Sequence, residues 1–215
     1  MPTSELIYRV AEMKDHDLVL KFLQDFFFPE ECINIAHPIK DDTMEELFAM
    51  SLLPEGNMVM ALDKHSDEFA GLLMFGPITK EYSNESREEG EETSNRKWRE
   101  ILYFMSNLEA KADICRRYQV GVALHLHGVA VSKNFRGQGI GEKLFEECFR
   151  QAKLKNIGIV SADCTSPYSV RIAEKLGMEL ASTFSYDEYH KSLGKTIFTN
   201  AKPQGIVKTF IKKIL

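Results

Sequence analysis

The sequence lacks features that several classes of protein require. No run of its 215 residues approaches the roughly 18 to 20 apolar residues of a membrane-spanning helix, and residues 1–5 lack the basic and apolar regions of a secretory signal. The four cysteines are widely spaced and form no Cys-x-x-Cys pair, which argues against a disulfide-stabilised secreted domain and a zinc ribbon. We therefore expect a cytoplasmic protein without a membrane partner.

Positive charge is also in short supply. Lys and Arg total 27 against 32 Asp and Glu, so the formal net charge is −5. Non-specific binding of nucleic acid needs clustered positive charge, so we expect no nucleic-acid partner. A cationic small molecule suits the acidic balance at least as well. The hydrophobic and charged fractions, 44% and 27%, are typical of a soluble globular protein with a full core.

Hydrophobic periodicity divides the chain into strands and helices. Runs rich in β-branched and aromatic residues predict strands at 5–11, 58–62, 69–75, 120–131, 157–164, 179–186 and 206–211. A period near 3.6 predicts helices at 14–28, 96–117, 140–153 and 168–176, and a capping box of Thr43 and Glu46 predicts a further helix start. The alternation of strands and helices favours an α/β or α+β sheet with crossover helices, in a single domain over residues 1–215.

One segment departs from the average composition. Residues 83–95 hold five glutamates, one arginine and no large apolar side chain. Such a composition is typical of solvated chain, so we predict a polar loop insertion spanning about 79–97.

The most specific motif lies between a predicted strand and a predicted helix, and it reads Arg136-Gly137-Gln138-Gly139-Ile140-Gly141. Glycines let backbone N–H groups face outward at a helix N-terminus, where the dipole favours an anion. Two better-known phosphate loops do not match, because Glu142 stands where the dinucleotide fingerprint needs glycine and Leu144 follows Lys143. The motif predicts a pyrophosphate site, with charge added by Arg136.

This motif and the preceding strand, with Val129 and Val131, resemble the acetyl-CoA signature of the GNAT superfamily of N-acetyltransferases. The resemblance implies an α+β fold with a mixed central sheet, flanked by helices and splayed where acetyl-CoA lies between two strands. It implies acetyl-CoA as co-substrate and no metal. The residues that it assigns to acetyl-CoA are Val129, Ala130, Val131, Arg136, Gly137, Gln138, Gly139, Ile140, Gly141 and Ser166.

Further segments resemble the insect arylalkylamine (dopamine-type) N-acetyltransferases. These are residues 26–34, where Cys32 replaces a proline, residues 164–169 and the helix end at 174–177. In that family a glutamate acts as base through water, helped by two hydroxyls. Carried over by position, these roles fall on Glu31, Thr165 and Ser169, and the first hydroxyl is a serine in the family.

A second candidate base lies on the strand before the glycine motif. Period 2 places His125 and His127 on one face, and an ordinary pKa near ~6.5 suits proton relay. The pair resembles the His-x-His of vertebrate serotonin N-acetyltransferases, but Ala173 stands where those enzymes have a thiolate-protonating tyrosine. His127 therefore competes with Glu31 as base, and a structural role is equally open. A metal site would need a third ligand that the sequence does not place nearby.

The resemblance predicts N-acetylation of a small primary amine by direct attack in a ternary complex. We expect an arylalkylamine such as dopamine, octopamine, tyramine or serotonin, and a monomeric enzyme. A polyamine acetyltransferase of the spermine or putrescine type is the alternative within enzymes. A catalytically weak acetyl-CoA-binding regulatory module is the alternative from another class.

Overall fold

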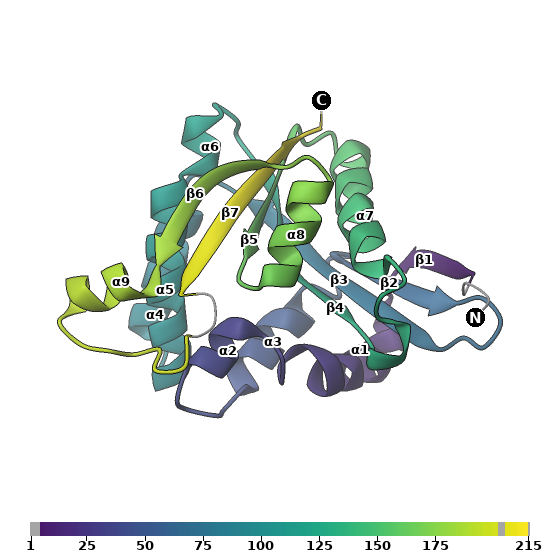
Figure 1. The fold of residues 1–215 in the computed structure, drawn as a ribbon, viewed down its shortest axis with the longest axis horizontal. Helices are drawn as coiled ribbons and strands as arrows, with labels where there is room; N and C mark the ends of the chain where they lie inside the picture. Colours follow the sequence, from purple (N-terminus) through teal and green to yellow (C-terminus); the bar gives the residue numbers. More distant parts are fainter. Residues whose placement is uncertain (1–4, 202–204, 215) are drawn as a thin grey trace.

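A seven-stranded mixed sheet organises the molecule, in the strand order β1-β2-β3-β4-β5-β7-β6 (Figure 1). The computed structural model describes residues 5–201 and 205–214. The strands are β1 (Leu6–Val10), β2 (Met58–Asp63), β3 (Phe69–Ile78), β4 (Ala123–Val131), β5 (Ile159–Cys164), β6 (Glu179–Ser185) and β7 (Ile206–Lys213). Neighbours are antiparallel except β4 and β5, which run parallel. The mixed sheet with flanking helices confirms the predicted α+β fold.

Helices cover both faces of this sheet. They are η1 (Met13–Asp15), α1 (His16–Phe22), the π-helical turn η2 (Leu23–Phe27), α2 (Cys32–Ala36), α3 (Thr43–Ser51), α4 (Tyr82–Glu92), α5 (Arg96–Ala112), α6 (Ile114–Arg117), η3 (Lys133–Phe135), α7 (Ile140–Leu154), α8 (Pro167–Lys175) and α9 (Tyr186–Leu193). In Figure 1, α7 and α8 lie in front of the sheet and α1, α2 and α3 along its lower edge. Among the described helices, none is both long and apolar enough to cross a membrane.

The central strands diverge along their length. In the described chain, the parallel ladder between β4 and β5 pairs only 124–126 with 160–162, although β4 continues to Val131 and β5 to Cys164. On its other side β4 stays paired with β3 up to Val131. The sheet is therefore splayed beyond Leu126, as predicted, and one edge of β4 is left without a strand.

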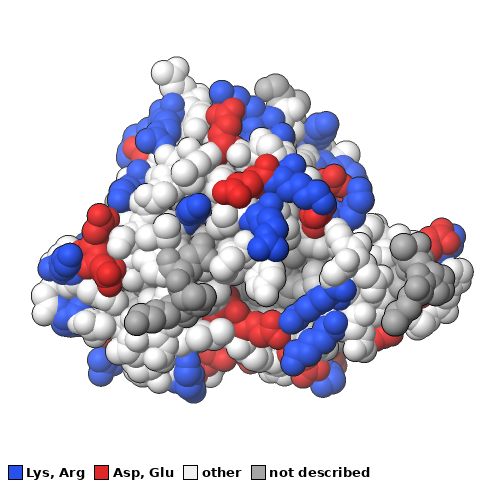
Figure 2. All heavy atoms as spheres, viewed as in Figure 1, with Lys and Arg blue, Asp and Glu red and all other residues white. Residues whose placement is uncertain are grey.

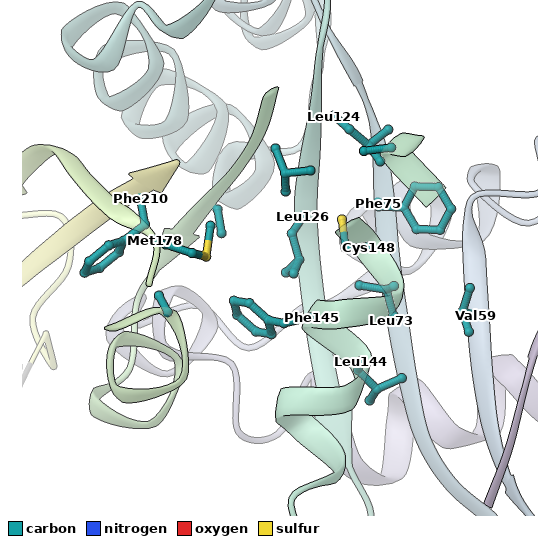
Figure 3. Close-up of a cluster of buried hydrophobic side chains, with 14 of the residues drawn as sticks. Val59, Leu73, Phe75, Leu124, Leu126, Leu144, Phe145, Cys148, Met178 and Phe210 are labelled. Atoms are coloured by element: carbon teal, nitrogen blue, oxygen red, sulfur yellow. The ribbon is translucent and has the colours of Figure 1, made fainter. Parts of the chain in front are cut away.

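The largest apolar cluster packs α7 against the sheet. Leu144, Phe145 and Cys148 of α7 point toward β3 and β4, where they meet buried side chains such as Leu73 and Leu126 (Figure 3). Full burial of a leucine or phenylalanine contributes about 1.5–3 kcal/mol. This cluster holds the N-terminus of α7 in a fixed place beside the splay.

The predicted polar loop at 83–95 is wrong, because most of it forms helix α4. Glutamate and arginine are good helix formers, and small residues let the helix approach α5 closely. A Cβ on Gly90 would lie 2.8 Å from the Tyr103 ring. The Trp98 indole donates to Glu89 at 2.7 Å, and Arg99 donates to the carbonyl of Gly90 at 3.2 Å. Packing on α5 thus decides the structure of this polar segment.

Other differences concern helix ends. Helix α3 begins at Thr43 as predicted, but Asp42 is its N-cap residue and the Thr43 hydroxyl donates to Asp41 at 2.7 Å. The predicted helix 96–117 divides at Asp113, which has φ +42°, into α5 and α6. The sequence patterns also missed the short helices α2 and α9, which have only five and eight residues.

Candidate active site

The loop before α7 has the geometry of an anion site. Gly137 and Gly139 have φ of +77° and +78°, and a Cβ on either would meet nothing within 4 Å. The first amides of α7 have no partner within the helix, and the helix dipole adds positive potential there. Gln138 lies in the loop before the helix, and Ile140 and Gly141 begin its first turn. The open, amide-rich face fits a pyrophosphate group.

Arg136 connects this loop to the segment before α2. Its Nε donates to the carbonyl of Val131 at 3.0 Å, and its Nη2 pairs with Glu30 at 2.8 Å. Both charged side chains are substantially exposed. A pyrophosphate at the α7 N-terminus would compete with Glu30 for this guanidinium.

The predicted pantetheine residues lie on the unpaired part of β4. Val129, Ala130 and Val131 pair with β3 but lie beyond the ladder that joins β4 to β5. Val129 and Val131 are partly buried on the α7 side, whereas Ala130 packs in the cluster formed with α1 and α3. Backbone groups on the open edge are available to an extended ligand that adds as a strand.

Glu31 and Thr165 meet, although they are 134 positions apart in the chain. The Thr165 hydroxyl donates to Glu31 Oε1 at 3.4 Å, and the Asn34 amide donates to Oε2 at 2.8 Å, so that Glu31 is the N-cap residue of α2. Burial raises the pKa of Glu31, and the Asn34 amide opposes this shift. A carboxylate with a raised pKa is suited to accept a proton near neutral pH.

Ser166 and Ser169 form the capping box of α8. The Ser169 amide donates to Ser166 Oγ at 3.1 Å, and the Ser169 hydroxyl donates to the Ser166 carbonyl at 3.0 Å. These contacts place Ser169 one helical turn from Thr165. The Ser169 hydroxyl also lies 3.0 Å from the Ser166 hydroxyl.

His127 lies at the point where the sheet begins to splay. Met74 pairs with Gly128 and Phe75 with Leu126, so His127 is the extra residue of a β-bulge. Bulges of this kind are frequent beside active sites because they redirect a side chain. A Cβ on Gly76 would lie 2.9 Å from His127 Nε2, so the glycine makes room for the ring.

The two histidines share one face of β4, as period 2 predicts. Their ring centroids lie 5.0 Å apart, and the His127 ring also contacts the rings of Phe48 and Tyr82 at 5.3 and 6.3 Å. Burial lowers the pKa of His125 to about 4 and that of His127 to about 3. Both imidazoles are therefore neutral at pH 7, and burial makes each a weaker base than a histidine in water.

Tertiary structure adds residues that no sequence signal distinguished. Tyr186, at the start of α9, is buried near Glu31 and Cys32. Burial raises the pKa of its phenol, and the charges of Glu31 and Cys32 raise it further. Glu109 and Asp163 lie beside His125. Ala173 is fully buried and contributes only to core packing.

Acidic side chains gather near the lower edge of the molecule in the view of Figure 2, between α8 and α2, next to a group of basic side chains. The face of the molecule seen in Figure 2 is thus mixed in charge. On charge alone this face therefore does not distinguish an anionic ligand from a cationic one.

Comparisons with known proteins agree with this geometry. The model of the acetyltransferase (GNAT) family matches residues 19–178. The crystal structure of mosquito arylalkylamine N-acetyltransferase like 5b is 32% identical, with a TM-score of 0.92, and the match covers 97% of this chain and 100% of that one. A Drosophila melanogaster polyamine N-acetyltransferase that forms N-acetylagmatine is 27% identical, with a TM-score of 0.90 and coverage of 97% and 100%.

Proposed function

Because the chain belongs to the acetyltransferase (GNAT) family, we propose that it acetylates the primary amine of a small arylalkylamine, of the dopamine, octopamine, tyramine and serotonin class. The co-substrate is acetyl-CoA, and the family transfers its acetyl group. The contact between Glu31 and Thr165 at the splay carries the proposal, since it unites a candidate base and a hydroxyl beside the open edge of β4.

The chain's own residues divide the chemistry among them. Amides of residues 137–141 and Arg136 bind the pyrophosphate, the edge of 129–131 pairs with the pantetheine, and Ser166 adds a polar contact. Glu31 accepts a proton from the attacking nitrogen through a water molecule, while Thr165 and Ser169 order that water and the nearby oxygen atoms. The nitrogen lone pair attacks the thioester carbon, the C–S bond breaks, and the departing thiolate takes a proton.

An aromatic surface next to His127 supports an aromatic substrate. The Phe48 ring contacts both the His127 and the Trp98 rings, at centroid distances of 5.3 and 5.9 Å. Flat rings of this kind bind another ring by stacking or edge contacts, and each such pair contributes about 0.5–1.5 kcal/mol. The mosquito relative also bears the arylalkylamine name.

A polyamine-type substrate is the second candidate, and one observation favours it. Glu45 is buried near Glu31, and its charge contributes to the raised pKa of that residue. A second carboxylate suits a substrate with a second cation, such as the agmatine of the Drosophila relative's product. Lys97 opposes this reading, because its Nζ lies 2.6 Å from Glu45 and neutralises the carboxylate.

An amine panel tests the proposal. Free thiol release from acetyl-CoA is measured with dopamine, octopamine, tyramine and serotonin, and with agmatine, putrescine and spermine. We expect higher kcat/KM for the aromatic amines. A preference for the multivalent amines would favour the second candidate. Binding of acetyl-CoA without turnover of any amine would instead indicate a regulatory module.

A further inference from the structure

A row of polar side chains crosses the sheet on the face that packs against α5. Strand alternation sends Leu124, Leu126, Val160 and Ala162 into the apolar cluster under α7, and turns the intervening residues to the other face. There the side chains of three adjacent strands and of α5 meet. They are His125 of β4, Ser161 and Asp163 of β5, Thr209 of β7 and Glu109 of α5.

The contacts within this row are close. Asp163 Oδ1 accepts from the Thr209 hydroxyl at 2.6 Å, and its Oδ2 lies 3.8 Å from His125 Nε2. His125 Nδ1 lies 2.9 Å from the Ser161 hydroxyl. One carboxylate oxygen of Glu109, one carboxylate oxygen of Asp163 and one ring nitrogen of His125 all lie within 4.8 Å of one another. The row reaches His127 through the 5.0 Å contact of the two imidazoles.

Two carboxylate oxygens in this cluster, Glu109 Oε1 and Asp163 Oδ2, are buried and have no hydrogen-bond donor. The side chain of Asp163 is 5% exposed, and Glu109 as a residue is 6% exposed. Two ionised carboxylates this close and this buried repel each other strongly, so one of them holds a proton. The hydrogen bond from the Thr209 hydroxyl favours the charged form of Asp163. Burial, and after it the charge of Asp163, raises the pKa of Glu109 well above its usual range.

We propose that Glu109 and Asp163 share one proton and, with His125, form a route by which His127 passes on a proton taken from the substrate ammonium. This inference rests on the proposed function. The single negative charge of the pair stabilises a proton that moves onto the neutral imidazoles. Glu109 and Asp163 act through the histidines and do not touch substrate.

The reaction releases a proton that such a route would carry away. An ammonium nitrogen loses two protons when it becomes an amide. One proton, which Glu31 accepts from the nitrogen through water, goes on to the CoA thiolate as the C–S bond breaks and the C–N bond forms. The other must reach solvent. Glu109 also lines a cavity of about 150 Å³ with Tyr82, Ser83 and Asp113, which gives the shared proton an outlet on the α4–α5 side of the sheet.

Other titratable groups around the pair stay in one state near neutral pH. Tyr82 of α4 and Cys115 of α6 both have a raised pKa, chiefly through burial, and so remain a phenol and a thiol. Ser161 and Thr209 supply only hydroxyls. The pair and the two histidines are therefore the groups of this cluster that exchange protons.

A divalent cation could use the same three side chains, and the test must separate it from a proton. The variants are Glu109→Gln, which keeps the size of a protonated glutamate, and Asp163→Asn, which keeps an oxygen for Thr209. The matched control is Glu100→Gln, because Glu100 is another buried glutamate of α5 paired with a histidine, His37, at 2.9 Å.

The first measurement is the infrared spectrum at neutral pH. We expect a carboxylic-acid carbonyl band that Glu109→Gln removes, Asp163→Asn shifts and Glu100→Gln leaves unchanged. The second is steady-state kinetics with the best amine of the panel. We expect Glu109→Gln and Asp163→Asn to lower kcat on the order of 3- to 10-fold, with the KM for acetyl-CoA unchanged, because a relay loses less than a general base.

Three outcomes would overturn the proposal. One is the absence of an acid band that depends on Glu109. Another is full kcat in both variants, which would leave the pair a structural feature. The third is binding of one equivalent of zinc sulfate by the wild type but not by Glu109→Gln, which would identify a metal site. An enzyme that acetylates no amine would refute the proposed function while the infrared result still decides whether the proton is shared.

Discussion

At the scale of single residues, Glu31 is the side chain whose replacement tests the chemistry most directly. Glu31→Gln keeps the size and the Asn34 contact but removes the basicity. We expect kcat to fall on the order of 10- to 10³-fold, since loss of a general base commonly gives about 10² to 10⁴ and a water relay leaves residual activity. His127→Ala should cost less, because that imidazole only extends the route.

The measurement is the pair of pH profiles of kcat/KM with acetyl-CoA saturating. Burial raises the pKa of Glu31, so its ionisation should define the acidic limb in the wild type. If Glu31→Gln kept the full rate and this limb while His127→Ala abolished both, the histidine would be the base.

His125 makes stability depend on pH. Burial lowers its pKa from 6.5 to about 4, so between these values the unfolded chain binds a proton that the folded protein does not. The free energy of unfolding should therefore fall as the pH falls through this window, and His125→Gln should flatten that part of the curve. Urea denaturation across the window checks this, with the exposed His65→Gln as control. Parallel curves for wild type and His125→Gln would contradict the assignment.

At the scale of elements, the pyrophosphate site that we propose at the N-terminus of α7 depends on backbone conformation. Gly139 has φ +78°, where a side chain costs roughly 1–2 kcal/mol, and a β-branched residue costs most. Gly139→Val should raise the dissociation constant of acetyl-CoA about tenfold or more. Calorimetry measures it. Gly139→Asn, which tolerates the left-handed conformation, should raise it less; unchanged binding in the valine variant would remove this loop from the site.

Helix α4 gives a second prediction at this scale, because its contact with α5 depends on a small residue. A side chain at Gly90 would have to displace the Tyr103 ring, which lies 2.8 Å from the position of its Cβ. Gly90→Val should lower the free energy of unfolding by about 1–3 kcal/mol, as overpacking commonly does. Glu91→Ala, on the exposed side, is the control and should change it by less than about 0.5 kcal/mol. Equal thermal midpoints for both variants would show that α4 is not packed on α5 in solution.

At the scale of the whole molecule, the open splay predicts a large response to acetyl-CoA. A ligand at 100 times its dissociation constant stabilises the folded state by about 2.7 kcal/mol, which is a rise of about 5–10 °C in Tm for a chain of this size. We expect acetyl-CoA and free CoA to give this rise and the amine alone to give little. Differential scanning calorimetry measures it, and an unchanged Tm with acetyl-CoA would contradict binding in the splay.

Local sequence determined the elements whose signals lie within a few residues. The alternation on β4 placed His125 and His127 on one face, and the glycines of 136–141 marked the loop that opens α7, because backbone conformation and strand period act locally. The motif also led to the correct family and fold, since its strand–loop–helix setting is itself local.

Only the tertiary structure decided what depends on distant segments. Composition alone predicted a loop at residues 83–95, whereas packing on α5 makes most of them a helix. The contact of Thr165 with Glu31 and the meeting of Glu109 with Asp163 join parts of the chain whose spacing carries no signal. Burial then sets the proton affinity of these groups, and burial is a property of the packed molecule, because the same side chains in water would titrate at their ordinary values.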